Sequence, residues 1–251
     1  MKKIIAVINQ KGGVGKSTTA EALAAGLSLK GYKALSVDLD AQANLTYTSG
    51  AKTDGATALG VLTGEVKPQD AIQHTKSGDI IAANKALAGA DAFIADTGKE
   101  YKLKEALESV KADYDYIIID TPPALGILTI NALTACDSVI IPAQADIYSL
   151  QGIEQLAETM KPVKKYCNPS LTIEGILLTR YSSRSVLSRE VAELAEQLAA
   201  KLGTKLFKTT IREAIAVKES QISQQSLYSY APKAKVTEDY TAFISELLGE
   251  E

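Results

Sequence analysis

The chain of 251 residues has no tryptophan, one histidine and only two cysteines, and these scarcities exclude several kinds of site. Cys136 and Cys167 stand 31 positions apart and form no Cys-x-x-Cys pair. We therefore expect free thiols rather than a disulfide or a bridging metal cluster, and this use of cysteine favours a cytoplasmic protein. A lone histidine is usually an ordinary surface or loop residue, so His74 is given no role.

Long hydrophobic runs are also absent, although 46% of the residues are hydrophobic. No run approaches the roughly 20 residues that a membrane-spanning helix needs. The first apolar run, at residues 4–8, begins so close to the first residue that no signal peptide is expected. No basic amphipathic tail follows the last expected helix, so a membrane anchor is not expected either.

Short apolar runs alternate with longer helical patterns along the whole chain. Continuous apolar runs are typical of strands in a parallel sheet that helices cover on both faces. We predict one α/β domain of residues 1–251 with a mostly parallel central sheet. The expected strands are residues 4–8, 34–37, 116–119, 138–141 and 175–178, and the expected helices include residues 18–29, 103–110, 150–165, 188–202 and 237–248.

A glycine-rich segment links the first expected strand to the first expected helix. Glycines let backbone N–H groups converge on an anion without Cβ clashes, and the start of the helix adds to the attraction. The segment resembles the phosphate-binding pattern Gly-x-x-x-x-Gly-Lys-Ser, in which the lysine (Lys16) binds the β- and γ-phosphates and the hydroxyl (Ser17) binds Mg²⁺. Gln10 replaces the first glycine of that pattern, and a second lysine, Lys11, follows it. The expected nucleotide-binding residues here are Lys11, Gly12, Gly13, Val14, Gly15, Lys16, Ser17 and Thr18.

Aspartates end two of the expected strands. Asp38 and Asp40 close the second strand, and Asp120 closes the third before a Thr-Pro-Pro turn. The carboxyl ends of parallel strands form the edge at which open α/β sheets bind ligands. Because Mg²⁺ gives up its water reluctantly, carboxylates there hold the ion largely through water. We predict a Mg²⁺ site made by Ser17 directly and by Asp40 and Asp120 through water.

The glycine-rich loop with its second lysine, the Asp38-Leu-Asp40 stretch and the Asp120-Thr-Pro-Pro turn, in this order, resemble the ParA/MinD family of ATPases. The resemblance covers essentially the whole chain and is strongest to the short ParA proteins that partition chromosomes and plasmids. It implies a P-loop NTPase fold, ATP and Mg²⁺ as cofactors, and ATP hydrolysis as the activity. No helix-turn-helix precedes the first expected strand, so binding to an operator is not expected.

The resemblance also implies roles for single residues. In this family the additional lysine, Lys11 here, crosses a dimer interface to the nucleotide of the partner. A cation at that place would stabilise the charge that develops on the γ-phosphoryl oxygens. The second aspartate, Asp40, orients the attacking water, whereas Asp38 matches a structural acid. Lys11, Lys16 and Asp40 are therefore the expected catalytic residues.

The segment expected to contact the nucleobase departs from the family pattern. Short ParA proteins often carry Ile-Pro-Arg-Asn where this chain has Ile211-Arg212-Glu213-Ala214. The missing proline and asparagine leave open whether Ile211 and Arg212 contact the base and whether the site selects ATP over GTP. Backbone groups of the segment can still contact the base, because they do not depend on the side chains.

The net charge of −3 is distributed unevenly. Residues 178–235 carry ten Lys or Arg against five Asp or Glu, and residues 236–251 carry five acidic residues and no basic one. Such a basic region can bind DNA phosphates, or it can be an ordinary solvated surface. The resemblance implies an ATP-dependent homodimer, associated with the nucleoid, that binds DNA nonspecifically and is released by a ParB-like centromere-binding protein. The candidate DNA-binding residues are Arg180, Arg184, Arg189, Lys205, Lys208, Lys218 and Lys235.

Two alternatives stay open at this point. One is a MinD-like or other ParA-related ATPase that positions a protein cargo without binding DNA. The other is a metabolic P-loop enzyme such as dethiobiotin synthetase, which would need a pocket for a small molecule and would lack the additional lysine. DNA binding separates the first alternative from a partition ATPase.

Overall fold

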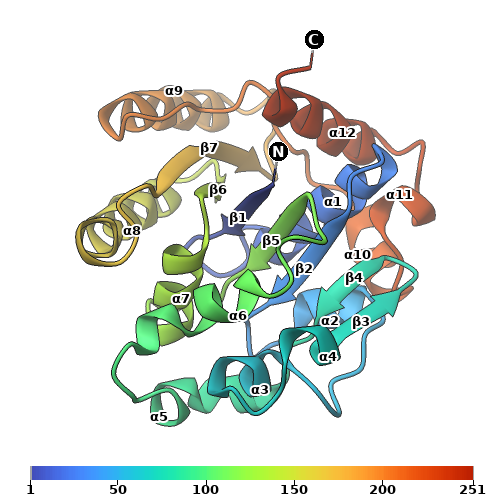
Figure 1. Cartoon of the computed structure of the whole chain (residues 1–251). Coiled ribbons are helices and arrows are strands. Elements are labelled where there is room, and N and C mark those ends of the chain that lie inside the picture. The colour runs from blue at the N-terminus through green and yellow to red at the C-terminus, as the bar shows by residue number, and fades with distance from the viewer. Residues whose placement is uncertain (1, 251) are drawn as a thin grey trace.

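A seven-stranded sheet forms the centre of the computed structural model, which describes residues 2–250 (Figure 1). The strands are β1 (Lys3–Val7), β2 (Ala34–Asp38), β3 (Ile72–Thr75), β4 (Gly78–Ile81), β5 (Tyr116–Asp120), β6 (Ser138–Gln144) and β7 (Thr172–Thr179). Their order is β3-β4-β2-β5-β1-β6-β7, and every neighbouring pair is parallel except β3 with β4. The predicted mostly parallel sheet is confirmed.

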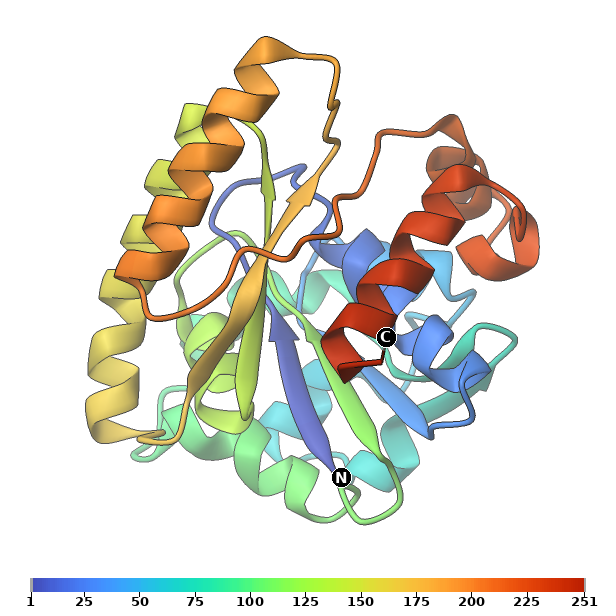
Figure 2. The ribbon, with the colours of Figure 1, turned by 90° about the horizontal axis from the view of Figure 1, so that it is seen from above.

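Helices cover both faces of the sheet, as predicted. They are α1 (Lys16–Leu29), α2 (Asn44–Thr48), α3 (Ala58–Thr63), α4 (Pro68–Ala71), α5 (Ala90–Phe93), α6 (Lys102–Glu108), α7 (Ile127–Ala135), α8 (Ile147–Tyr166), α9 (Val186–Lys201), α10 (Ile215–Ile222), α11 (Leu227–Tyr230) and α12 (Lys235–Leu248), with the 3₁₀ turns η1 (Lys85–Gly89) and η2 (Lys99–Tyr101). Ile5 and Val7 of β1 belong to the apolar cluster of α1, α11 and α12, whereas Ala6 belongs to that of α3 and α6 to α9. Figure 2 shows α8 and α9 on one side of the sheet and α1 and α12 on the other.

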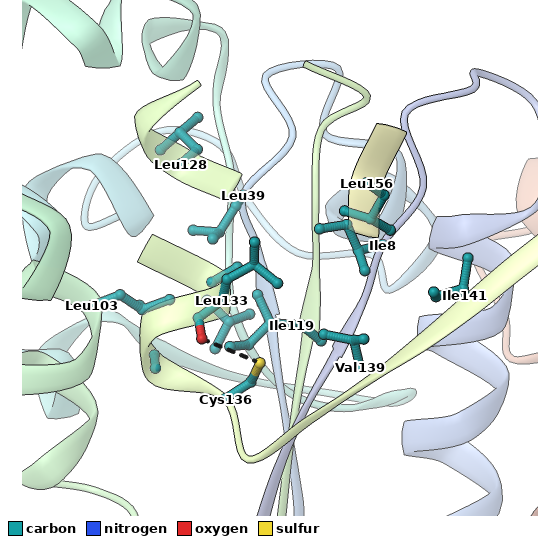
Figure 3. Packing of buried hydrophobic residues seen from close by; sticks show 14 of the residues in the cluster. Ile8, Leu39, Leu103, Ile119, Leu128, Leu133, Cys136, Val139, Ile141 and Leu156 are labelled. Carbon is teal, nitrogen blue, oxygen red and sulfur yellow. Dashed lines mark hydrogen bonds between the residues drawn. The ribbon is translucent and has the colours of Figure 1, made fainter. Parts of the chain in front are cut away.

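The larger of the two apolar clusters contains one of the cysteines (Figure 3). Leu39, Ile119 and Leu133 are fully buried in it together with Cys136. Burial raises the pKa of the Cys136 thiol well above its ordinary value, so the thiol stays protonated and unreactive. Cys136 and the half-buried Cys167 are both free, as predicted.

The edge hairpin formed by β3 and β4 was not predicted. Its strands have four residues each, and β3 is polar, because Gln73, His74 and Thr75 supply three of its four residues. A short edge strand with one exposed face has no continuous apolar run. The register of the hairpin places His74 opposite Asp79, and His74 Nδ1 lies 2.7 Å from Asp79 Oδ1.

The longest helix, α8, begins at Ile147, three residues before its predicted start. The Asp146 side chain accepts a hydrogen bond from the Ser149 N–H and so satisfies one free donor of the first turn. Neither this helix nor any other in residues 2–250 is both long and apolar enough to cross a membrane.

The chain that follows α9 runs beside β7 and extends the sheet at that edge. Leu206 forms a parallel bridge with Ile176, and Ile211 forms one with Thr179. The Ile211 N–H donates to the Leu178 carbonyl at 2.8 Å. These bridges bring residues 211–214 to the carboxyl end of β7, at the same edge of the sheet as the glycine-rich loop.

Candidate nucleotide-binding site

The glycine-rich loop lies between β1 and α1 and borders a cavity of about 630 Å³. Gly13 and Gly15 adopt φ values of 76° and 86°, in the left-handed region that favours glycine. No side chain caps the start of α1, so its first N–H groups remain free to bind an anion. Of the predicted loop residues, those that line the cavity are Gly12, Gly13, Gly15, Lys16, Ser17 and Thr18.

Val14 has a different position from its neighbours in the loop. Its side chain is fully buried, and its carbonyl accepts a hydrogen bond from Thr179 Oγ1 at 2.8 Å. Only the Val14 backbone N–H therefore remains for a nucleotide. The valine anchors the loop to β7 rather than lining the cavity.

The Lys16 side chain extends back over the loop. Its ammonium donates to the Lys11 carbonyl at 3.2 Å, and the side chain lines the cavity. Burial lowers the pKa of Lys16, while the carboxylates of Asp120 and Asp40 act in the opposite direction. The lysine is thus held at the loop with two acids near enough to affect its charge, as expected where a phosphate chain and its cation would bind.

Asp120 at the end of β5 is a buried acid without a partner. The residue is fully buried, and neither carboxylate oxygen accepts a hydrogen bond from any group in residues 2–250. Burial raises the pKa of Asp120 well above its usual range and the nearby Asp38 carboxylate raises it further, against the opposing effects of the nearby Ser17 hydroxyl and Lys16 ammonium. A buried carboxylate in this state needs a cation or donors from bound water. Asp120 and the Ser17 hydroxyl therefore fit a hydrated Mg²⁺ ion.

Asp38 and Asp40 are held in different ways. Asp38 is buried and accepts hydrogen bonds from the Thr46 N–H, the Thr46 hydroxyl and the Asp40 N–H at 2.7–3.0 Å. Burial raises the pKa of Asp38 to about 6 despite these donors. Asp40 lines the cavity and accepts one hydrogen bond, from the Gln42 N–H at 2.9 Å. The structure thus gives Asp38 the surroundings of a structural acid, whereas Asp40 lines the cavity.

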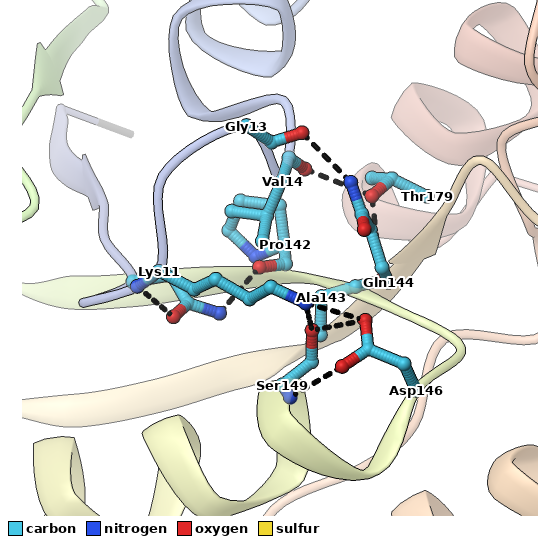
Figure 4. Close-up of polar contacts among 10 residues, drawn as sticks. Lys11, Gly13, Val14, Pro142, Ala143, Gln144, Asp146, Ser149 and Thr179 are labelled. Atoms are coloured by element: carbon cyan, nitrogen blue, oxygen red, sulfur yellow. Dashed lines mark hydrogen bonds and ion pairs between the residues drawn. The ribbon is translucent and has the colours of Figure 1, made fainter.

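Lys11 does not line the cavity of its own chain, and its side chain extends toward Asp146 and Ser149 (Figure 4). Its ammonium forms an ion pair with Asp146 Oδ2 at 2.6 Å and lies 3.4 Å from Ser149 Oγ. Burial alone would raise the pKa of Asp146, but Lys11 and the Ser149 donors outweigh it and hold the pKa below its usual range. The Lys11 side chain is about one-third exposed, at 32%. It is therefore accessible to a second molecule.

Polar side chains that were not predicted fix the loop to the sheet (Figure 4). Asn9 accepts from the Lys11 N–H at 2.9 Å and donates to the Pro142 carbonyl at 2.8 Å. Gln144 Nε2 donates to the Gly13 carbonyl at 2.8 Å. Asn9 follows β1 and Gln144 ends β6, so both lie at the carboxyl edge of the sheet, where ligands bind. This position at a strand end is the feature of the sequence that could have indicated them.

A second cavity of about 270 Å³ adjoins the loop on the side of β7. The predicted base-contacting residues Ile211 and Arg212 both line it, together with Tyr240, which was not predicted. The Arg212 guanidinium forms two hydrogen bonds of 2.7 Å with Asp239, which hold the side chain against α12 and engage two of its five N–H donors. This favours backbone groups of the segment over the arginine side chain as base contacts.

The candidate DNA-binding residues occupy several different elements. Arg180 pairs with Glu213, and Lys205 lies 4.8 Å from the ring centre of Phe207. Arg184 and Arg189, at the start of α9, are exposed and form no ion pair within residues 2–250. Lys208 and Lys235 are exposed as well, whereas Lys218 lines the nucleotide cavity. Within one subunit, the candidate DNA-binding residues do not all lie on the same helix or strand.

Comparisons with known proteins agree with this geometry. Residues 2–173 match the model of the AAA domain family. The chain is 41% identical to the sporulation initiation inhibitor protein Soj of Bacillus subtilis (strain 168), over 98% of both chains. It is 37% identical to the chromosome partitioning protein ParA of Myxococcus xanthus (strain DK1622), over 98% of this chain and 88% of that one. The crystal structure of a cobyrinic acid a,c-diamide synthase from Mycobacterium smegmatis with bound ADP and magnesium has a TM-score of 0.85 and 36% identity, and it covers 99% of this chain and 94% of that chain.

A P-loop nucleoside triphosphatase uses a lysine and a serine at the start of the first helix together with an aspartate at a strand end. Here these are Lys16, Ser17 and Asp120, and the Asp120 carboxylate has no hydrogen-bond partner within residues 2–250. The chain belongs to the ParA/MinD family of P-loop ATPases. It is an ATP hydrolase, with ATP and Mg²⁺ as substrate and cofactor.

Proposed function

We propose that this protein is a ParA-type DNA-partitioning ATPase of one domain, residues 1–251. Two subunits would close face to face on ATP, bind DNA nonspecifically, and separate when a ParB-like partner stimulates hydrolysis. The observation that carries the proposal is the position of Lys11. Its ammonium lies outside the cavity of its own chain and on the exposed edge, bound to Asp146.

The surface around Lys11 supports a second copy of the chain as the group that Lys11 meets. Large apolar side chains are exposed in segments that follow β2, β6 and β7 at this edge, and one at the end of α10 lines the cavity. Exposed apolar side chains gathered at one edge mark an interaction surface. They are Tyr47, Ile147, Tyr148, Val186, Leu187 and Ile222, each at least half exposed.

The chain's own residues supply the groups that hydrolysis needs. Lys16 would bind the β- and γ-phosphates, and Ser17 with Asp120 would hold the Mg²⁺ ion, which neutralises charge on the phosphates when bound. Asp40 lines the cavity with one carboxylate oxygen that accepts no hydrogen bond within residues 2–250, so it can orient a water molecule. Lys11 of the partner would complete the site by leaving Asp146.

A random-sequence duplex tests the DNA part of the proposal. Wild-type protein is expected to bind the duplex with ATP and to bind at least about tenfold more weakly with ADP or without nucleotide, because only the closed dimer combines the basic residues of two chains. Affinity should fall steeply as salt rises, since phosphate contacts release counterions. A double variant, Arg184→Ala with Arg189→Ala, should lose DNA binding and keep ATP binding.

The absence of DNA binding would favour the second candidate function. If ATP produces a dimer that binds no DNA at any salt concentration, the protein is a ParA-related ATPase that positions a protein cargo. Arg184 and Arg189 would then be ordinary surface residues.

A further inference from the structure

Lys218 on α10 lines both cavities of the nucleotide site. The larger cavity holds Lys16, Ser17 and Asp40, and the smaller one holds Ile211. The sequence grouped Lys218 with the DNA-binding candidates, but its position at the nucleotide is a separate property. The wall that the two cavities share consists of Gly13, Gly15, Thr18, Lys218 and Gln221.

The parts of a nucleoside triphosphate follow one another in a fixed order, from the base through the ribose to the phosphates. A residue on the wall between the two cavities therefore lies beside the middle of the ligand. The β- and γ-phosphates belong beside Lys16 and Ser17 in the larger cavity. The base belongs in the smaller cavity, beside Ile211. The groups between these ends are the α-phosphate and the ribose, and only the α-phosphate carries the negative charge that an ammonium group binds.

Two contacts hold α10 in place against the site. Gln221 Nε2 lies 3.2 Å from Thr18 Oγ1 in the first turn of α1. Gln224, just beyond α10, donates to the Tyr47 carbonyl of α2 at 3.1 Å. Residues three apart on a helix share a face, so Lys218 and Gln221 are both directed at the loop.

Lys218 also differs from the arginines nearby in having no competing acid. Arg180 pairs with Glu213, and Arg212 pairs with Asp239. Lys218 forms no ion pair or side-chain hydrogen bond with the part of the chain between residues 2 and 250. Its ammonium is therefore available to a ligand in the cavity.

We propose that Lys218 binds the α-phosphate of the nucleotide and so belongs to the nucleotide site rather than to the DNA surface. The proposal rests on the ATP site described above but not on DNA binding or on the dimer. Because ATP and ADP share the α-phosphate, Lys218 stabilises both complexes alike and holds ADP after hydrolysis.

The test compares Lys218→Ala with wild type by calorimetry on the monomer, using ATP, ADP, AMP and adenosine. The dissociation constants for ATP, ADP and AMP should each rise about five- to tenfold, the effect of one partly solvated charged contact. Adenosine, which has no phosphate, should bind both proteins equally. Lys218→Arg should restore most of the affinity, and Lys164→Ala, an exposed lysine of α8, is the matched control.

Two results would overturn the assignment. Unchanged affinities for all four ligands, combined with weaker DNA binding, would make Lys218 a DNA-binding residue. A loss for ATP and ADP without a loss for AMP would place the ammonium at the β-phosphate instead. A wild-type protein that binds ADP but no DNA would contradict the proposed function and leave the calorimetric test of Lys218 intact.

Discussion

Lys16→Ala is expected to weaken ATP binding about 100-fold and to abolish measurable hydrolysis. The lysine lines the cavity within the electrostatic influence of Asp40 and Asp120, and its removal would take away the cation proposed to bind the β- and γ-phosphates. Contacts with charged groups contribute about 1.5–3 kcal/mol each, which corresponds to roughly 10- to 150-fold in affinity. Calorimetric titration with ATP and Mg²⁺ measures the loss.

The control for this variant is the thermal unfolding of the free protein. The Lys16 side chain makes one hydrogen bond in the part of the chain that the structure describes, to the Lys11 carbonyl, so Lys16→Ala should fold with nearly unchanged stability. A variant that binds ATP with wild-type affinity would show that the glycine-rich loop is not the phosphate site.

Asp40→Ala is expected to bind ATP and to form the dimer, while hydrolysis falls by at least about 100-fold. Asp40 lines the cavity, and one of its carboxylate oxygens meets no donor among the described residues, so it can orient the attacking water without being needed to bind the phosphates. Groups that position a reacting water or accept its proton contribute roughly 10²- to 10⁴-fold. Single-turnover hydrolysis of bound ATP separates the chemical step from binding.

Asp38→Ala is the informative contrast, because the two acids stand two positions apart. The Asp38 carboxylate accepts three hydrogen bonds from Thr46 and Asp40, so its loss leaves buried donors unpaired. That variant should lose stability by about 1–3 kcal/mol, measured by urea unfolding. Normal turnover by Asp40→Ala would remove Asp40 from the catalytic set.

The sequence predicted the sheet and the phosphate loop because both are local patterns. Apolar runs of five and four residues mark β1 and β5, and the glycines, Lys16 and Ser17 are close together in the chain. Strand-end acids such as Asp120 follow from the rule that ligands bind at the carboxyl edge of a parallel sheet. The polar edge strand β3 lacks such a run, so its pattern was too weak to predict.

The partners of the basic side chains could not be predicted, because they depend on contacts between segments that are far apart in the sequence. Lys11 and Asp146 are 135 positions apart, and nothing in either segment indicates that they pair. Arg212 pairs with Asp239 of α12, 27 positions later in the chain. Lys218 lines the cavity beside the loop because the contact of Gln221 with Thr18 places α10 next to the first turn of α1. A basic residue in the sequence does not reveal whether it faces DNA, an acid or a nucleotide.

The central claim is that Lys11 acts at the nucleotide of the partner subunit. The most direct test measures the molecular mass of two proteins in the presence of ATP, Asp40→Ala alone and Asp40→Ala combined with Lys11→Ala. Lys11 lies outside its own cavity, so its contribution is expected at the partner's nucleotide. Sedimentation should show a dimer for Asp40→Ala with ATP and a monomer when Lys11 is also replaced, although both proteins bind ATP. A double variant that dimerises as strongly as Asp40→Ala would contradict the account.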